Sequence, residues 1–245
     1  MTPLASAQLL SLWEAGEEWP DHRRAQALLA ADRPDLSPTA IARFSPGQRD
    51  SQLLRLREML FGQQMSAVFE CQQCGETLEF ELSSPAASIP EAPPEDAPAF
   101  SVEVGPWQAR FRLPEGGDLE VLADCASIEE GRARLLERCL IEVLGPDGPM
   151  PIVEASPELV ESVEARMAEL DPQANMAVDL TCPMCGTPTT APFDVSHFFW
   201  QEIDQWARHT LHDVHTLARA YGWSEAEVLA LTARRRQQYM ELIYA

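Results

Sequence analysis

Four of the six cysteines stand in two short units of the same form. Cys71 and Cys74 are separated by two residues and followed by glycine, and Cys182 and Cys185 repeat this arrangement. The two-residue spacing lets both thiolates of a unit face one metal ion. The glycine can adopt the left-handed backbone conformation that the turn needs. Each unit therefore has the form of a zinc knuckle.

One knuckle supplies two ligands, whereas a structural zinc ion takes four in a tetrahedron at about 2.3 Å from sulfur. We therefore predict that Cys71, Cys74, Cys182 and Cys185 bind one structural Zn²⁺ and form a zinc ribbon. About 100 residues separate the knuckles, but the free energy of loop closure grows only slowly with length. A shared site requires the sulfurs of Cys74 and Cys182 to lie within about 5 Å of each other.

Three other uses of these cysteines compete with a shared site. A thioredoxin-like redox pair needs one such unit, which opens a helix after a strand, whereas both units here stand between predicted strands. Disulfides are disfavoured in the reducing cytosol. Two half-sites completed by other chains are the third arrangement. A catalytic zinc would keep an open position and usually has His or carboxylate ligands, so four thiolates favour a structural ion.

The other cysteines and a row of histidines fit a metal site less well. Cys125 and Cys139 lack ligand spacing, and we expect them to be buried helix residues. His209, His212 and His215 fall on the polar face of a predicted helix, with no carboxylate partner and no second ligand helix. We expect these histidines to be exposed.

The chain of 245 residues is strongly acidic, with 39 Asp and Glu against 18 cations and a net charge of −21. All the cations are arginine. Such a charge repels nucleic acid and anionic membranes. The acids of the ribbon region are Glu70, Glu76, Glu79, Glu81, Asp179 and Asp194. A phosphate-binding ribbon needs cations near its turns, so we predict a structural clamp that contacts neither nucleic acid nor membrane.

Neither a secretory signal nor a membrane span is predicted. The first residues lack a basic stretch followed by an apolar run, and no segment approaches about 20 apolar residues. We expect a cytoplasmic protein. No phosphate-binding loop, His-Glu-x-x-His motif or nucleophile elbow is present, so we predict that the protein is not an enzyme.

The apolar periodicity predicts a mainly helical α+β protein. Helices are expected over residues 5–15, 20–31, 46–61, 118–123, 128–144 and 157–170, and strands near 67–82, 102–113, 176–180 and 192–195. The predicted divisions are an N-terminal helical region (1–66), the zinc ribbon (67–82 plus 176–195), an inserted α/β subdomain (83–175) with a Pro-rich linker (85–98), and C-terminal helices (196–245).

The C-terminal region carries clear helix signals. Ser196 is the expected cap of a helix that starts at His197 and ends at Gly222. Its predicted apolar stripe consists of Trp200, Ile203, Ala207, Leu211, Val214, Ala218 and Tyr221. Ser224 opens the next helix with a capping box, and Thr232 is a candidate cap for 233–244. For Arg234, Arg235 and Arg236 we expect a solvated face, with docking on acidic groups of a partner or of this chain as the alternative.

Several motifs resemble a known family. They are Gly47-Gln48-Arg49-Asp50, Leu53-Leu54, Phe61-Gly62, Phe111-Arg112-Leu113-Pro114 before Asp118-Leu119, Phe193-Asp194, Phe199-Trp200, Val214-His215 and Tyr221-Gly222-Trp223-Ser224-Glu225. Together they are similar to the T4-type phage baseplate family, which includes baseplate hub assembly chaperones and has relatives among contractile injection systems. The resemblance implies a protein–protein role with other baseplate or tail proteins as partners.

From these observations we predict a non-enzymatic, zinc-stapled assembly or structural protein of a phage-tail-like contractile particle. The alternative is a zinc-ribbon regulator that binds nucleic acid or a polymerase. Removal of zinc should melt the fold if the ion is structural.

Overall fold

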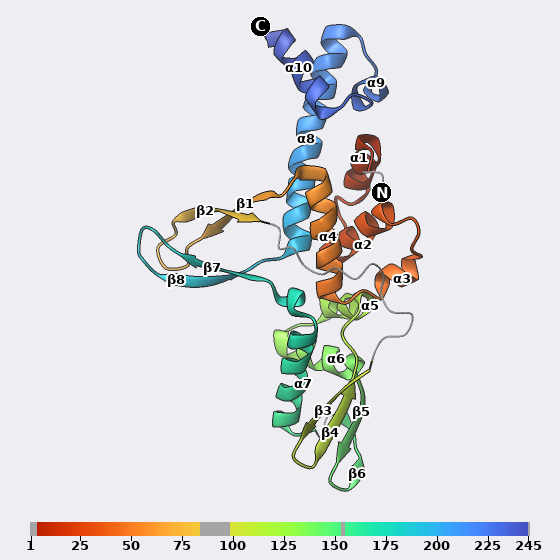
Figure 1. Ribbon diagram of the computed structural model, residues 1–245, viewed down its shortest axis with the longest axis vertical. Helices are drawn as coiled ribbons and strands as arrows, with labels where there is room; N and C mark the ends of the chain where they lie inside the picture. Colours follow the sequence, from red (N-terminus) through yellow and green to blue (C-terminus); the bar gives the residue numbers. More distant parts are fainter. Residues whose placement is uncertain (1–3, 84–98, 153–154, 245) are drawn as a thin grey trace.

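The computed structural model describes residues 4–83, 99–152 and 155–244, and it is a mixed α+β fold with mostly helical content. Figure 1 shows an elongated molecule in which a central group of helices carries three projections. A mixed α/β part lies at one end of the long axis, the C-terminal helices lie at the other, and an arm of paired strands extends sideways. The predicted linker 85–98 lies outside the described residues.

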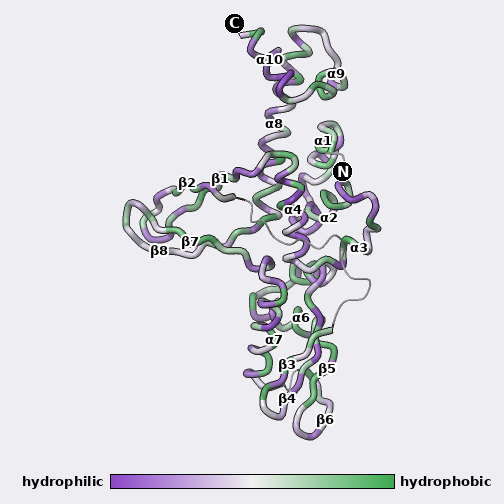
Figure 2. Tube along the Cα trace, in the orientation of Figure 1, coloured by the Kyte–Doolittle hydropathy of each residue, from purple (hydrophilic) through white to green (hydrophobic). Residues whose placement is uncertain are grey.

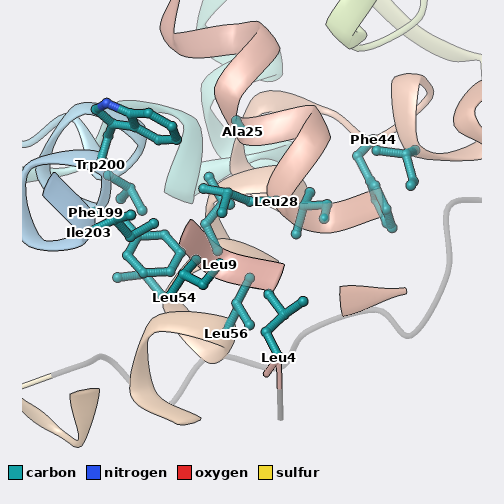
Figure 3. Close-up of a cluster of buried hydrophobic side chains, with 14 of the residues drawn as sticks. Leu4, Leu9, Ala25, Leu28, Phe44, Leu54, Leu56, Phe199, Trp200 and Ile203 are labelled. Atoms are coloured by element: carbon teal, nitrogen blue, oxygen red, sulfur yellow. The ribbon is translucent and has the colours of Figure 1, made fainter. Parts of the chain in front are cut away.

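The central group contains α1 (Ser6–Ala15), α2 (Asp21–Asp32), α3 (Pro38–Ala42) and α4 (Pro46–Phe61). The short α3, which the sequence did not predict, begins where Ser37 accepts a hydrogen bond from the Ala40 N–H and Pro38 occupies the first turn. A capping box between Ser45 and Gln48 starts α4. These helices enclose the largest core cluster, in which Leu28, Leu56 and other aliphatic residues meet Phe199 and Ile203 (Figure 3).

Helix α8 (Val195–Tyr221) runs from this core to the C-terminal end of the molecule (Figure 1). The predicted start was wrong: Asp194 caps the helix by accepting from the His197 N–H, and Ser196 is buried inside the first turn. Trp200, Ile203, Ala207 and Val214 are buried as predicted. The other members of the predicted stripe, Leu211, Ala218 and Tyr221, are half-buried or exposed, because the far part of α8 packs on different helices.

Those helices are α9 (Glu225–Leu229) and α10 (Ala233–Tyr244), which form a small separate core with α8. Thr232 accepts a hydrogen bond from the Arg235 N–H at the start of α10, as predicted. The prediction of a solvated arginine run was wrong for Arg236, which is 4% exposed and faces Asp213 across 3.9 Å. Arg234 and Arg235 are exposed.

The inserted part contains a four-stranded antiparallel sheet in the order β3 (Phe100–Val104), β4 (Trp107–Phe111), β5 (Leu140–Gly145) and β6 (Gly148–Pro149). The first two strands are the predicted hairpin. Helix α7 (Pro157–Leu170) packs on β3 and β4. The segment between sheet and centre forms α5 (Gly116–Leu119), the 3₁₀ helix η1 (Glu120–Asp124) and α6 (Ile128–Cys139), so the expected helix 118–123 is split into two short elements.

The predicted helix 128–144 was wrong in its last five residues, because α6 ends at Cys139 and the chain continues as β5. The apolar pattern of residues 139–144 is compatible with the period of a helix and with that of a strand. Leu140 and Val143 are buried, whereas Ile141 is exposed. Pairing with β4 decides in favour of the strand. Ala109 lies opposite Val143, and Arg110 makes a cross-strand ion pair with Glu142 at 3.5 Å.

The arm consists of two antiparallel hairpins, β1 (Gln64–Glu70) with β2 (Thr77–Ser83), and β7 (Ala177–Thr181) with β8 (Pro188–Pro192). The hairpins lie side by side and project from the central helices (Figure 1). The strand expected at 192–195 instead ends at Pro192, since α8 begins at Val195. Figure 2 shows hydrophilic and hydrophobic residues mixed along the arm, and β2 alternates between the two kinds. Among the described residues, no helix combines the length and apolarity needed to cross a bilayer.

Candidate metal centre

The two hairpin turns at the tip of the arm have the same backbone geometry. The Cys71 N–H donates to the Glu76 carbonyl at 2.8 Å, and the Gly75 N–H donates to the Cys71 carbonyl at 2.8 Å. In the second turn, Cys182 and Gly186 make the equivalent bonds, to Thr187 and Cys182, at 3.0 and 2.8 Å. Gly75 and Gly186 both have φ of 72°, a left-handed conformation that favours glycine. Each turn thus directs its two sulfurs to one side.

The structure brings the four predicted sulfurs together. The Sγ atoms of Cys71 and Cys185 are 3.7 Å apart, those of Cys74 and Cys182 are 3.6 Å apart, and all four lie within 4.8 Å of one another. A tetrahedron with about 2.3 Å between zinc and sulfur has edges of about 3.8 Å. The separations of 3.7 and 3.6 Å match those edges, and the other separations, none above 4.8 Å, exceed them by at most about 1 Å.

The cluster has an internal two-fold character. In each turn the first cysteine is buried, at 3% for Cys71 and 0% for Cys182, and the second is exposed. Each buried sulfur faces the exposed sulfur of the other turn. Leu78 and Phe69 pack against the buried pair. All six cysteines lie within the described residues and none forms a disulfide.

The pKa values of two of the cysteine thiols are shifted in opposite directions by their surroundings. Hydrogen bonding from the hydroxyl and backbone N–H of Thr187 lowers the pKa of Cys185 to about 6. A backbone hydrogen bond from Glu76 lowers the pKa of Cys74, but desolvation and the three neighbouring cysteines raise it to about 12. Four thiolates at this separation repel one another. A bound cation removes that repulsion and the protons together.

The donor set fits a soft divalent ion in a closed site. Four sulfurs occupy all the corners of a tetrahedron, and such a site leaves no position for water or substrate. The four close cysteines could therefore hold one metal ion, with Thr187 supporting the ligand Cys185. Sequence reasoning missed Thr187, although its position, two residues after a knuckle cysteine, is a usable signal.

The six acids of the ribbon region are all exposed. Asp179 accepts a hydrogen bond from Thr190 across β7 and β8 at 2.7 Å, while Asp194 caps α8. The surface around the cysteines therefore has negative charge, and no arginine stands between residues 57 and 110 to offset it.

A buried arginine attaches the arm to the central helices. Arg57, 2% exposed, donates to the backbone carbonyls of Gly62 and Gln64 and makes a two-pronged ion pair with Glu202 of α8 at 2.6 and 2.8 Å. These contacts join the end of α4, the start of β1 and α8. Met65 and Met176, which begin the two halves of the arm, both pack in the central core cluster. Both hairpins are thus held to one support.

The inserted part returns to the same support through Asp171. Its carboxylate accepts a hydrogen bond from the Gly47 N–H at 2.9 Å, in the first turn of α4. A side chain at Gly47 would overlap this carboxylate. Nearby Asp50 is 8% exposed, and desolvation by burial, together with Asp194 and Asp171, raises its pKa to about 6 against the opposing effect of Arg49.

The remaining candidates lie away from the cluster. Cys139 is buried, and desolvation raises its pKa to about 11. Cys125 is half-buried after η1, not buried in a helix, so that expectation was wrong. His209, His212 and His215 are exposed, as expected. Within the described residues, the four cysteines are the one group with metal-binding geometry.

Comparison with known proteins provides the decisive observation. The model of the family described as T4 bacteriophage base plate protein matches residues 35–200, which is more than half of the chain and includes both knuckles. This protein belongs to the T4 baseplate family. No curated protein and no solved structure matches it.

Two of the motifs on which the sequence resemblance was based lie in the matched segment at joints of the fold. Gly47 and Asp50 lie where α4 meets the end of the inserted part. Arg112 pairs with Asp118 at 2.5 Å, and Arg138 pairs with the same carboxylate at 2.7 Å. Desolvation opposes these interactions, but the arginines and the Glu115 N–H prevail and lower the pKa of Asp118 to about 2. Membership of this family supports a structural role in a phage baseplate and contacts with other baseplate proteins.

Proposed function

We propose that this protein is a non-enzymatic structural or assembly component of the baseplate of a phage-tail-like contractile particle. It works through protein–protein contacts and is stapled by one zinc ion. The family match over residues 35–200 carries the proposal. Incorporation in the particle is tested by purifying particles from cells that express a tagged chain. Co-purification with baseplate proteins is expected, and its absence from both particles and assembly intermediates would refute the proposal.

The proposed ligands of the zinc ion are Cys71, Cys74, Cys182 and Cys185. The support is the tetrahedral spacing of the sulfurs and the closed, all-sulfur donor set. Elemental analysis of the purified chain should find about one zinc per chain. Cys74→Ser should lose the metal, whereas Cys125→Ser is the matched control and should keep it. Another metal in the purified chain, or equal zinc in both variants, would contradict the assignment.

We also propose that the surface of the arm contacts protein and not nucleic acid or membrane. The exposed carboxylates around the knuckles and the net charge of −21 oppose binding to phosphates. The competing regulator hypothesis is tested with a filter-binding assay on DNA and RNA over a range of salt concentrations. No retention is expected, and salt-sensitive retention at micromolar protein would favour the regulator.

The proposed functional divisions are an N-terminal helical region (1–66), a ribbon (67–82 plus 176–195), an inserted subdomain (83–175) and C-terminal helices (196–245). The separate core clusters of the centre, the inserted sheet and the C-terminal helices support this division. In this arrangement the ribbon closes the base of the inserted subdomain. Limited proteolysis should cut between these parts before it cuts within them.

A further inference from the structure

The inserted part carries an open groove that the metal centre and the central core do not use. The groove has a volume of about 640 Å³ and lies between η1, α6 and α7. Its walls are mostly apolar and include Leu122, Cys125, Ile128, Leu135, Leu136 and Met167. This volume is within the range of about 300–1,000 Å³ that is typical of sites for ligands or anchoring side chains.

Ile128 is the clearest sign that the groove receives an occupant. It is the first residue of α6 and is 87% exposed. The helix start needs only Ser127, whose hydroxyl accepts a hydrogen bond from the Glu130 N–H at 3.1 Å. An isoleucine at the next position adds nothing to this cap. Its apolar surface contributes free energy only when another molecule removes it from water.

The charges around the groove indicate the chemistry of that occupant. The nearby arginines are already paired within the chain: Arg132 with Glu164 at 2.5 Å, Arg134 with Glu130 at 2.8 Å and Arg166 with Glu169 at 2.8 Å. In contrast, Asp124 and Glu129 are the sequence neighbours of the lining residues Cys125 and Ile128 and make no ion pair with any described residue. Glu161 of α7 also makes none, and it interacts only at longer range with Arg132, which Glu164 already pairs. The unpaired charge on the three elements that form the groove is therefore negative.

We propose that this groove binds an apolar segment of another baseplate protein whose anchoring side chains are flanked by arginine or lysine. The proposal rests on the proposed function, to which it adds a contact surface and the chemistry of the partner. A second copy of this chain is a poor occupant because each copy has a net charge of −21. A bare acyl chain would leave the three carboxylates uncompensated.

Gly131 offers a variant that closes the groove without weakening the fold. A Cβ atom at this position would lie 3.6 Å from Leu122 Cδ2 and 4.0 Å from Cys125 Sγ, both ordinary contacts. Gly131 lines the groove, so Gly131→Leu adds a large side chain to its wall, and leucine is a better helix former than glycine by about 0.5–1 kcal/mol. Ala133→Leu adds a side chain to an exposed position of the same helix outside the groove and is the matched control.

The test uses the full zinc-loaded chain and synthetic peptides of about 18 residues, the length of an anchoring helix. One peptide has leucine at helical spacing and arginine elsewhere, a second has the same residues in shuffled order, and a third has glutamate in place of arginine. Binding is measured by calorimetry. Occupancy of the groove is measured by the alkylation rate of Cys125, followed by peptide mapping.

The expected result is binding of the first peptide with slower alkylation of Cys125. Gly131→Leu should weaken binding about tenfold or more, equivalent to about 1.4 kcal/mol, and Ala133→Leu should bind as the unmodified chain does. Equal binding to both variants, equal binding of the shuffled or acidic peptide, or a bound lipid or a second copy in the groove would overturn the proposal.

Particle assembly separates this proposal from the proposed function. Gly131→Leu should enter particles less efficiently than Ala133→Leu. If both variants enter particles equally, the groove proposal fails and the baseplate role stands. If the unmodified chain never associates with particles, the baseplate role fails whatever the peptides show.

Discussion

Removal of the proposed zinc ion is expected to unfold the arm and leave the central helices folded. The arm has little core of its own: Leu78, the two buried cysteines and the partly buried Phe69 form its cluster. Burial of a large apolar side chain contributes about 1.5–3 kcal/mol. Ordering the backbone costs about 1–2 kcal/mol per residue, so this cluster cannot hold strands of seven and five residues in place.

A structural zinc ion contributes about 10–16 kcal/mol of apparent binding free energy. This is enough to offset the cost of ordering the strands of the arm, which the small apolar cluster does not. The central cluster includes none of the four cysteines and has its own set of buried aliphatic and aromatic residues. The expectation from the sequence, that chelation melts the fold, is therefore narrowed to the arm.

The assay is hydrogen–deuterium exchange read by mass spectrometry, with and without a strong chelator. Amides of 66–83 and 177–192 should exchange at rates near those of unstructured chain after the metal is removed, whereas those of α4 and the first half of α8 should keep their protection. Cys125→Ser should behave as the unmodified protein in both conditions. This reasoning would be refuted if the arm stayed protected after removal of the metal, or if the central helices lost their protection together with the arm.

Three further outcomes are expected from denaturant unfolding. The pKa of Asp50 is raised to about 6, so protonated Asp50 stabilises the fold below pH 3.8, and the free energy of unfolding falls by about 3 kcal/mol as the pH rises through 6. Asp50→Asn should remove this fall, and an Asp50→Asn protein whose stability depends on pH as the unmodified protein's does would count against the burial argument. Arg57→Met should lower the free energy of unfolding by about 3–5 kcal/mol because it leaves Glu202 and two backbone carbonyls unpaired. A decrease below about 1 kcal/mol would show that the contacts of Arg57 are not needed for stability. Gly47→Ala should destabilise, since the methyl group would lie 2.7 Å from the Ala174 nitrogen, whereas Gly117→Ala, with open space around it, should not; equal effects would contradict the close approach.

Local patterns were sufficient for most of the helices and for both hairpin turns. The capping box at Ser224 and the cap at Thr232 were readable because they depend on side chains within three residues of the helix start. The knuckles were readable for the same reason, since spacing and the following glycine fix the turn.

Segments compatible with two periods were decided by tertiary contacts. Residues 140–144 became a strand because β4 offered an unpaired edge and Arg110 faced Glu142. Arg236 became buried because α10 folds back on α8 and places it beside Asp213. Neither partner lies within one helical turn in the sequence, so no local pattern could have indicated these contacts.

The sequence by itself determined which four side chains have the chemistry and turn geometry to bind a metal. Only the tertiary structure decided that they meet, because Cys74 and Cys182 are 108 positions apart and the two hairpins must start from one support. That support is the central helical core, to which Arg57 attaches the arm and Asp171 attaches the returning chain. Short-range chemistry fixes each pair of cysteines, whereas the distance between the pairs depends on long-range packing that spacing does not encode.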